Sequence, residues 1–233
     1  MPPRRLQFVG EGDFKAVGDE FLGHFRELAG LQPDERVLDV GCGIGRMARP
    51  LAGWLDGGTY DGFDPNAVGI GWCQSRYPAN FRFTLVDLYN RRYHPTGTVK
   101  ASEVRFPYDD DAFDFAVLAS VLTHLLEDEA AHYLRETARV LRPGGRALAT
   151  LFLLDDASRE AIAGARSALR FLQPEAHVAV LRDDVPEEAV AYDERWLREQ
   201  AAQAGLSVRE PVHPGTWRSD DGRSFQDLVI LCA

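Results

Sequence analysis

Val37-Leu38-Asp39-Val40-Gly41-Cys42-Gly43-Ile44-Gly45-Arg46 is the stretch that decides the fold of this chain. An apolar run with one acid leads into three glycines at alternate positions, and the pattern behind them becomes helical. The stretch therefore predicts a buried strand, a tight turn and a helix start. Glycine allows the turn a positive φ and lets a ligand lie against bare backbone. The partial positive charge of a helix start favours a ligand whose docked end is anionic or polar.

The spacing of the glycines separates two kinds of cofactor-binding turn. The dinucleotide motif G-x-G-x-x-G has a third glycine that lets the helix pack closely on the strand. Counted from Gly41 that position holds Arg46, and counted from Gly43 it holds Ala48, a small residue that some dinucleotide sites tolerate. An acid, then three glycines at every second position, instead resembles motif I of the class I S-adenosylmethionine (SAM)-dependent methyltransferases. Three alternatives stay open: a nicotinamide-dependent Rossmann oxidoreductase, a noncatalytic SAM-binding subunit, and a structural turn that binds nothing.

The remainder of the chain adds strands and helices in the order of the same family. Further strands are predicted at 59–64, 81–87, 113–120 and 147–154. The helix before the last of them has acids in its first turn and arginines near its end, which complements its dipole, and Pro143-Gly144-Gly145 ends it. The segment Phe8–Leu154 and the ending 214–231 both resemble bacterial class I methyltransferases. The resemblance implies an α/β fold with a Rossmann-like, seven-stranded, mostly parallel sheet and helices on both faces.

Composition limits the organisation and the partners of the chain. With 233 residues, 45% of them hydrophobic, we expect one domain over 1–233 with one substantial core. Neither an apolar run of 18 residues nor a signal-peptide pattern occurs, and three scattered cysteines form no disulfide framework or zinc motif. The cytoplasm is therefore the expected compartment. A net charge of −10 argues against a nucleic-acid partner, because phosphate contacts need clustered Lys and Arg. We expect a small-molecule substrate and no membrane partner, and we assign no oligomeric state.

The resemblance implies where SAM, and its product S-adenosylhomocysteine, would bind. The methionine end would lie over Gly41 to Gly45, where the backbone amides, those of Gly41, Cys42 and Gly43 among them, and the helix end face its carboxylate. Asp39 would meet the ammonium group directly or through water. Asp64, at the end of the strand 59–64, would accept hydrogen bonds from both ribose hydroxyls. The structural alternative for Asp64 is the N-cap of the following helix.

The adenine contact has two candidates. Asp87 ends the third strand, where many relatives place an acid near the adenine amino group. The segment Ala101–Pro107, however, resembles the one that borders adenine elsewhere, which makes 88–100 an insertion. We favour Ser102 and Glu103 for the adenine edge and keep Asp87 as the competitor, with a loop-start cap as its structural alternative. Ser120, at the end of the fourth strand, completes the cofactor set.

The residues after the fourth strand indicate which kind of methyl transfer to expect. They read Ala119-Ser120-Val121-Leu122-Thr123-His124, without the Asn/Asp-Pro-Pro-Tyr run of enzymes that methylate DNA-base amines and without a strand-end Asp for Mg²⁺. We therefore expect metal-free transfer to a small molecule, with a hydroxyl of a sugar or secondary metabolite favoured. His124 is the candidate general base for that hydroxyl. A histidine bound by the backbone at a helix start is its structural alternative.

Two segments are candidates for the substrate side. The loop 88–100 carries Tyr93 and His94, and loops on a rigid sheet often bind substrate; a solvated insertion is equally consistent with it. The stretch 155–190 is a candidate insertion that covers the acceptor, with a solvated charged surface as the alternative.

Overall fold

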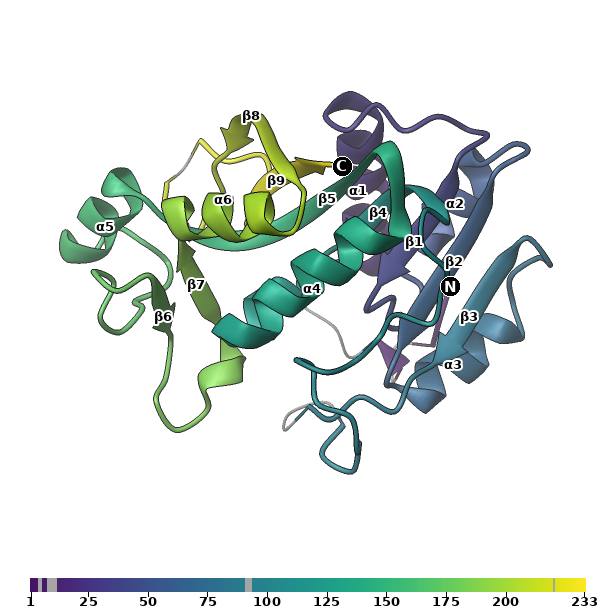
Figure 1. Cartoon of the computed structure of the whole chain (residues 1–233), viewed down its shortest axis with the longest axis horizontal. Helices are drawn as coiled ribbons and strands as arrows, with labels where there is room; N and C mark the ends of the chain where they lie inside the picture. The colour runs from purple at the N-terminus through teal and green to yellow at the C-terminus, as the bar shows by residue number, and fades with distance from the viewer. Residues whose placement is uncertain (4–5, 8–11, 91–93, 220) are drawn as a thin grey trace.

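The computed structural model describes residues 1–3, 6–7, 12–90, 94–219 and 221–233. Over these residues the chain forms one nine-stranded sheet in the order β3-β2-β1-β4-β5-β7-β6, with β9 pairing β5 and β8 pairing β9 (Figure 1). The strands are β1 (Arg36–Val40), β2 (Thr59–Asp64), β3 (Phe81–Leu85), β4 (Phe113–Leu118), β5 (Leu141–Leu154), β6 (Val178–Val180), β7 (Val190–Asp193), β8 (Ser207–His213) and β9 (Asp227–Cys232). The pairs from β3 through β5 are parallel, and β9 is antiparallel to β5.

Helices cover both faces of the sheet, which confirms the predicted fold class. The α-helices are α1 (Phe14–Glu27), α2 (Ala48–Trp54), α3 (Ala67–Gln74), α4 (Glu127–Val140), α5 (Asp156–Ala163) and α6 (Glu194–Gln203). Two short 3₁₀ helices, η2 (Leu122–His124) and η3 (Pro186–Glu188), lie in the connections. In Figure 1, α4 and α6 lie in front of the sheet, and α1 to α3 lie on its other side.

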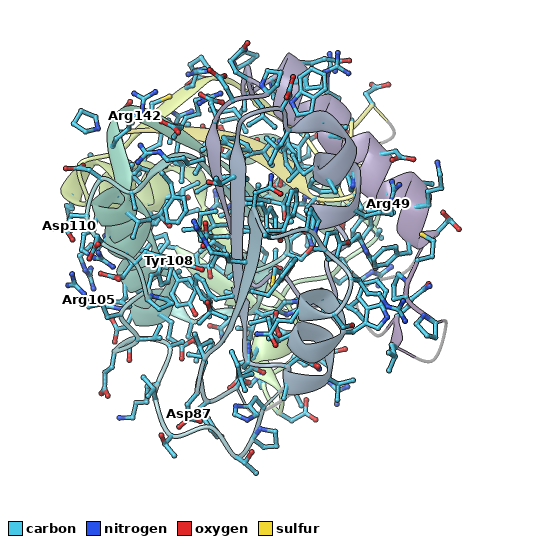
Figure 2. All side chains as sticks on the ribbon, turned by 90° about the vertical axis from the view of Figure 1, so that its right-hand side faces the viewer. Arg49, Asp87, Arg105, Tyr108, Asp110 and Arg142 are labelled. Atoms are coloured by element: carbon cyan, nitrogen blue, oxygen red, sulfur yellow. The ribbon has the colours of Figure 1, made fainter. Side chains whose placement is uncertain are left out.

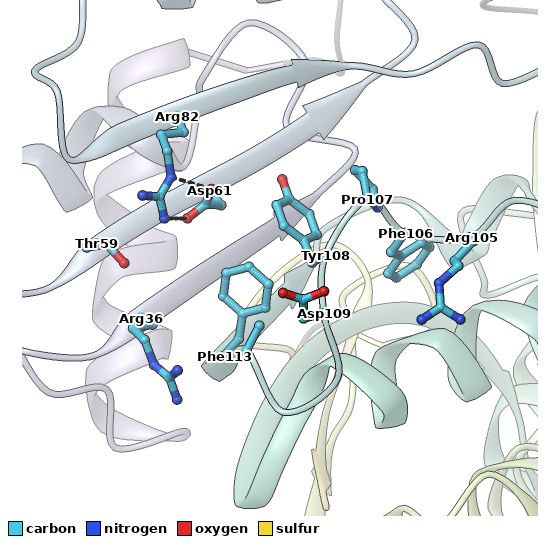
Figure 3. A pocket seen from close by; sticks show the side chains of 11 residues that line it. Arg36, Thr59, Asp61, Arg82, Arg105, Phe106, Pro107, Tyr108, Asp109 and Phe113 are labelled. Atoms are coloured by element: carbon cyan, nitrogen blue, oxygen red, sulfur yellow. Dashed lines mark hydrogen bonds and ion pairs between the residues drawn. The ribbon is translucent and has the colours of Figure 1, made fainter.

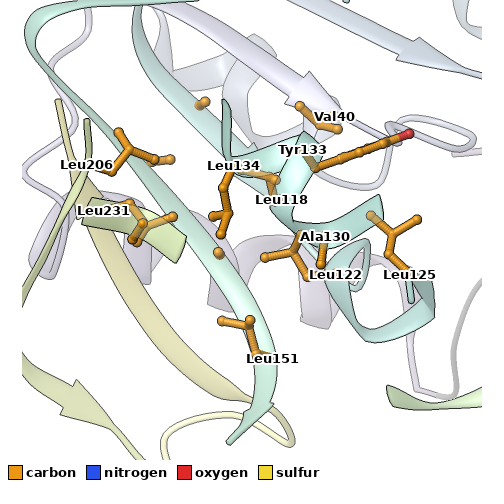
Figure 4. Packing of buried hydrophobic residues seen from close by; sticks show 14 of the residues in the cluster. Val40, Leu118, Leu122, Leu125, Ala130, Tyr133, Leu134, Leu151, Leu206 and Leu231 are labelled. Carbon is orange, nitrogen blue, oxygen red and sulfur yellow. The ribbon is translucent and has the colours of Figure 1, made fainter. Parts of the chain in front are cut away.

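The strands contribute side chains to two cores, one on each face of the sheet, because successive side chains point to opposite faces of a strand. Val37 of β1 is buried with Phe25 of α1 on one face, and Leu38 is buried with Leu134 of α4 on the other. Figure 4 shows Leu134 beside Leu118 of β4 in the second core. Strands covered on both sides read as continuous apolar runs, which is why the sequence pattern identified them.

The sheet has two more strands than predicted, and both come from the later part of the chain. β5 pairs with β9 from Arg146 to Leu151. Its last three residues, Phe152–Leu154, continue beyond β9 and pair in parallel with β7, which β6 then extends. The segment 155–190 supplies α5, β6 and η3 of this addition. The other seven strands follow the predicted arrangement.

Some predicted boundaries were wrong by several residues. The helix expected to end at Pro143-Gly144-Gly145 ends at Val140, and the strand expected from Ala147 begins at Leu141. Leu141 is already extended and pairs with Phe113 of β4, so strand pairing takes over before the helix-breaking residues. The third strand ends at Leu85, which leaves Asp87 in the connection that follows.

A buried carboxylate ties the loop between β8 and β9 to the sheet. Asp227 is fully buried and accepts hydrogen bonds of 2.8 Å from the amides of Leu153 and Gly215 and from the indole of Trp217. The Arg218 guanidinium lies 3.0 Å from the same carboxylate. Trp217 itself is fully buried, so it is a core residue rather than a platform for a substrate.

We expect Asp227→Ala to lower the free energy of unfolding by about 3–5 kcal/mol, because it leaves three buried donors without their acceptor and removes one of the two carboxylates that pair with Arg218. Urea unfolding followed by circular dichroism measures the change. Asp221→Ala, at an exposed position of the same loop, is the matched control and should unfold as the wild type does. Equal midpoints for the two variants would contradict this role of Asp227.

Candidate functional site

The glycine turn after β1 has the backbone conformation that the sequence predicts. Gly41, Gly43 and Gly45 have φ values of +70°, +54° and +78°. A Cβ at Gly41 would lie 2.9 Å from the side chain of Val121, so a larger residue there would collide with the chain that leaves β4. The turn does not lead directly into a helix, because α2 begins only at Ala48.

The backbone amides of this turn are bonded within the protein. Gly41 and Cys42 donate to the Phe63 carbonyl of β2 over 3.0 and 3.1 Å. Gly43 donates to Oδ2 of Asp64 over 2.8 Å. These three amides were predicted to face a ligand carboxylate, and the structure uses them to fasten the turn to the end of β2. What the turn offers a ligand is the exposed, side-chain-free backbone of Gly41.

Asp64 connects the turn to the next helix. Its Oδ2 accepts from Gly43, and its Oδ1 accepts from the amide of Asn66 over 2.8 Å. The N-cap of α3 is Asn66, whose side chain accepts from the Gly69 amide over 2.7 Å. The N-cap alternative for Asp64 was therefore wrong. Burial raises the pKa of the Asp64 carboxyl, while the amides of Asn66 and Gly43 oppose the rise.

Asp39 is a second buried acid at the same end of the sheet. Its side chain is 2% exposed and accepts a 2.6 Å hydrogen bond from the Tyr60 hydroxyl. Burial raises the pKa of Asp39 to about 7; the Tyr60 bond opposes the rise, and the charge of Asp64 adds to it. Two acids whose negative charges are disfavoured in this way would both be stabilised by a cation bound between them.

The candidates for the adenine edge lie at the carboxyl end of β3. Figure 2 places Asp87 at the end of the sheet opposite Arg142, which lies near the start of β5. The Asp87 carboxylate accepts from the amide and the hydroxyl of Thr98, and the hydroxyl bond lowers the pKa of Asp87. Asp87 thus closes the base of the loop 88–100, as its structural alternative predicted.

Ser102 and Glu103 lie in the turn that follows this loop. Ser102 is half-buried, and the exposed Glu103 lies 3.6 Å from Lys100. Their neighbours Ala101 and Val104 are buried in the core on the α4 side of the sheet. The turn is therefore fixed next to the end of the sheet that carries Asp64.

The end of β4 lies directly beside the glycine turn. Ser120 has a φ of +57°, which residues with a side chain rarely adopt. Its amide donates to the Thr150 hydroxyl over 2.7 Å, and its hydroxyl lies 3.1 Å from Oε1 of Gln226. Because Val121 contacts Gly41, the structure brings Ser120 and the turn together. Sequence reasoning missed Thr150 and Gln226, which no motif marks and which the pairing of β5 with β9 brings here.

His124 is the last residue of η2, and a residue of the segment 155–190 holds its side chain. Its Nδ1 lies 2.9 Å from the carbonyl oxygen of Glu187 in η3. A carbonyl only accepts, so Nδ1 carries the proton and Nε2 is the basic nitrogen of the neutral ring. The Tyr192 hydroxyl lies 2.6 Å from both the Leu122 and the Leu125 carbonyl, which fixes η2 on β7. The backbone bond expected of a structural histidine is thus present, and it also orients the ring.

The second histidine considered for the substrate side is bonded within its own loop. Nδ1 of His94 lies 2.8 Å from the carbonyl oxygen of Leu88. Tyr93 lies outside the described residues.

A cavity of about 480 Å³ opens away from all these residues, at the amino-terminal ends of the strands. Arg36 and Thr59, the first residues of β1 and β2, line it. Figure 3 shows Arg82 bonded to Asp61 through two hydrogen bonds, of 2.8 and 2.6 Å, on the wall that faces Tyr108. The arginines of this cavity already have carboxylate partners, and none of the predicted site residues lines it.

Among the described residues, no group of three or more His, Cys, Asp or Glu side chains is arranged to hold a metal ion. In the same part of the chain, no helix is both long and apolar enough to cross a membrane.

Comparison with known proteins shows what the chain is similar to. The model of the methyltransferase-domain family matches residues 16–210. A 117-residue segment, half of the chain, is 38% identical to the fatty-acid O-methyltransferase of Mycolicibacterium smegmatis and covers 36% of that protein. The chain spans about a third of the length of the curated relatives it matches.

Solved structures share the fold at low sequence identity. One is the Burkholderia thailandensis 1,6-didemethyltoxoflavin-N1-methyltransferase with bound 1,6-didemethyltoxoflavin and S-adenosylhomocysteine. It has a TM-score of 0.58 and 18% identity, over 94% of this chain and 78% of that one. The cyclase SpnF has a TM-score of 0.61 and 18% identity, over 97% of this chain and 83% of its own.

The raised pKa of Asp39 predicts a pH dependence of stability. Between about pH 4 and pH 7 the unfolded chain has released the Asp39 proton and the folded protein has kept it, so the free energy of unfolding falls as the pH rises. Over this window of about three pH units, the free energy of unfolding falls by at most about 4 kcal/mol. We expect Asp39→Asn, which can still accept from Tyr60, to gain stability relative to the wild type between pH 5 and pH 8.

Urea unfolding of both proteins at the two pH values measures this gain. Asp34→Asn, at an exposed position before β1, is the control and should follow the wild type at both. The same pH slope for the Asp39→Asn variant and the wild type would show that Asp39 ionises normally in the folded protein.

Proposed function

The chain belongs to the methyltransferase-domain family, and we propose that it transfers a methyl group from SAM to a small-molecule acceptor without a metal. The family match decides against the nicotinamide-dependent oxidoreductase that the glycine turn alone left open. The observation that carries the proposal is the geometry at the glycine turn, where the buried Asp39 and the half-buried Asp64, which accepts from the Gly43 amide, lie at the same end of the sheet. SAM brings an ammonium and a sulfonium cation, which such a pair would stabilise.

In this proposal the methionine part of SAM lies against the bare backbone of Gly41, over Cys42 and Gly43. Asp64 uses one lone pair of each oxygen for Gly43 and Asn66. A carboxylate offers about four acceptor positions, so both ribose hydroxyls can still donate to it. Asp39 contributes its charge from behind the turn.

For the adenine edge we propose Ser102 and Glu103 rather than Asp87. The Asp87 carboxylate is engaged with Thr98 at the base of its loop, which supports a structural role for it. Glu103 is exposed, and its turn is held by buried neighbours on the sheet.

Methyl transfer is an in-line displacement at the sulfonium carbon, so the protein has to align the nucleophile and exclude water. A hydroxyl acceptor also has to lose its proton in the transition state. We propose His124 as the general base, because the Glu187 carbonyl holds the tautomer in which Nε2 is basic. The position of Ser120 and the glycine turn beside the end of β4 supports a reaction at that place.

The acceptor is proposed only by class. A hydroxyl of a sugar or secondary metabolite remains the first choice, and the name of the Mycolicibacterium smegmatis relative adds fatty acids to the acceptors worth testing. SpnF carries a fold like this one and is named a cyclase, so methyl transfer has to be measured and not assumed from the fold.

We expect S-adenosylhomocysteine to bind in a 1:1 complex, measured by isothermal titration calorimetry, and NADH not to bind. Asp64→Ala should weaken this binding by roughly 1.5–3 kcal/mol, the range for hydrogen bonds to a charged group. Asp64→Asn keeps an oxygen for the Gly43 amide and should lose less. Asp87→Ala removes an acid from the connection after β3 and should bind as the wild type does. Heat with NADH and none with S-adenosylhomocysteine would overturn the proposal, and an unchanged affinity of Asp64→Ala would reduce Asp64 to a clamp of the turn.

We expect His124→Asn to lower kcat about 10²- to 10⁴-fold and to leave the affinity for S-adenosylhomocysteine unchanged. The asparagine amide can still donate to the Glu187 carbonyl, so the variant removes the base and keeps the contact. With labelled SAM and a hydroxyl acceptor, EDTA should have no effect on the wild-type rate. Wild-type turnover by the variant would make His124 structural, and loss of activity in EDTA that Mg²⁺ restores would contradict metal-free transfer.

A further inference from the structure

Three polar side chains meet where β4 ends, and the mechanism above uses only one of them. They are Ser120 after β4, Thr150 within β5 and Gln226 directly before β9. Thr150 is fully buried, and Oε1 of Gln226 accepts from the hydroxyls of both Ser120 and Thr150. Through Val121, which contacts Gly41, this group is continuous with the proposed cofactor site.

The hydrogen bonds fix which way the Gln226 amide points. The Thr150 hydroxyl accepts from the amide of Ser120, so its own hydrogen goes to Oε1 of Gln226. The Ser120 hydroxyl donates to the same oxygen. With its oxygen held by two hydroxyls, Gln226 presents Nε2 and its two N–H groups away from them, and within the described part of the chain Nε2 makes no hydrogen bond.

Two residues next to Gln226 are anchored by hydrogen bonds. Asp227, its neighbour in the chain, is anchored by Leu153, Gly215 and Trp217 in the core. Ser120 keeps a left-handed backbone conformation, which persists only where the surroundings impose it and which is common at functional sites. A donor held on such a support is oriented before any ligand arrives.

We propose that the Gln226 side-chain amide donates a hydrogen bond to an oxygen of the methyl acceptor and so positions that acceptor next to the transferred methyl group. This inference rests on the proposed methyl transfer and adds a requirement to it. The acceptor has to carry a carbonyl, carboxylate or hydroxyl oxygen close to its nucleophile. Gln226 is a specificity-determining residue in this account, and the cofactor does not contact it.

The test compares Gln226→Glu with the wild type, both saturated with SAM. Glutamate keeps an oxygen for Ser120 and Thr150 and loses the N–H donors. The acceptor probes are palmitate, glucose and 4-hydroxybenzoate. We expect the variant to raise KM for the methylated probe at least about threefold, the loss of one hydrogen bond, with an unchanged Kd for S-adenosylhomocysteine. Gln203→Glu makes the same chemical change at an exposed position of α6 and should leave KM unchanged.

A second measurement does not depend on turnover. The side-chain amide resonances of Gln226, assigned by their loss in Gln226→Glu, should shift when a probe is added to the wild-type complex with S-adenosylhomocysteine. Gln226→Met, which removes all polar atoms, should also raise KM if it folds. The proposal is overturned by an equal KM, by a changed Kd for S-adenosylhomocysteine, or by no probe shifting the amide of the bound complex. Failure of S-adenosylhomocysteine to bind at all would instead refute the proposed function.

Discussion

The hydrogen bond from the Gly43 amide to the Asp64 carboxylate joins the two strand ends on which the whole site depends. It holds a turn whose glycines have positive φ against the end of β2, and the Phe63 carbonyl holds the same turn through Gly41 and Cys42. Without the bond to Asp64, the Gly43 amide would lose its acceptor, and only the bonds of Gly41 and Cys42 would join the turn to β2. Each contact proposed for the cofactor depends on the position of that turn.

Two acids placed near each other at this site lower the stability of the folded protein, because desolvation disfavours their charged forms. Asp39 is buried, Asp64 is half-buried, and desolvation raises the pKa of both. A protein selected for stability alone would have little reason to keep two such acids in one place. A ligand with positive charge resolves the conflict, because it stabilises both carboxylates when it binds. The cavity at the other end of the sheet differs, since each arginine that lines it already has a carboxylate partner.

The sequence predicted what depends on local pattern and missed what depends on pairing between distant segments. The alternating glycines required positive φ, and continuous apolar runs identified the buried strands, so the fold class and the turn could be foreseen. Thr150 and Gln226 could not, because they meet only through the register of β5 with β9. The two added strands were missed for the same reason: β7 pairs with three residues at the end of β5. The N-cap of α3 is Asn66 because the helix begins only at Ala67, two residues later than an N-cap at Asp64 requires.

The central claim is that the cofactor binds at the carboxyl ends of β1, β2 and β4. Two-dimensional ¹H–¹⁵N NMR of the labelled protein, titrated with S-adenosylhomocysteine, tests it most directly. The account predicts that the largest backbone amide shift changes lie at 41–45 and 120–121, with Arg82 and Tyr108 of the distant cavity unaffected. Shift changes gathered at Arg82 and Tyr108, with the glycine turn unchanged, would contradict it.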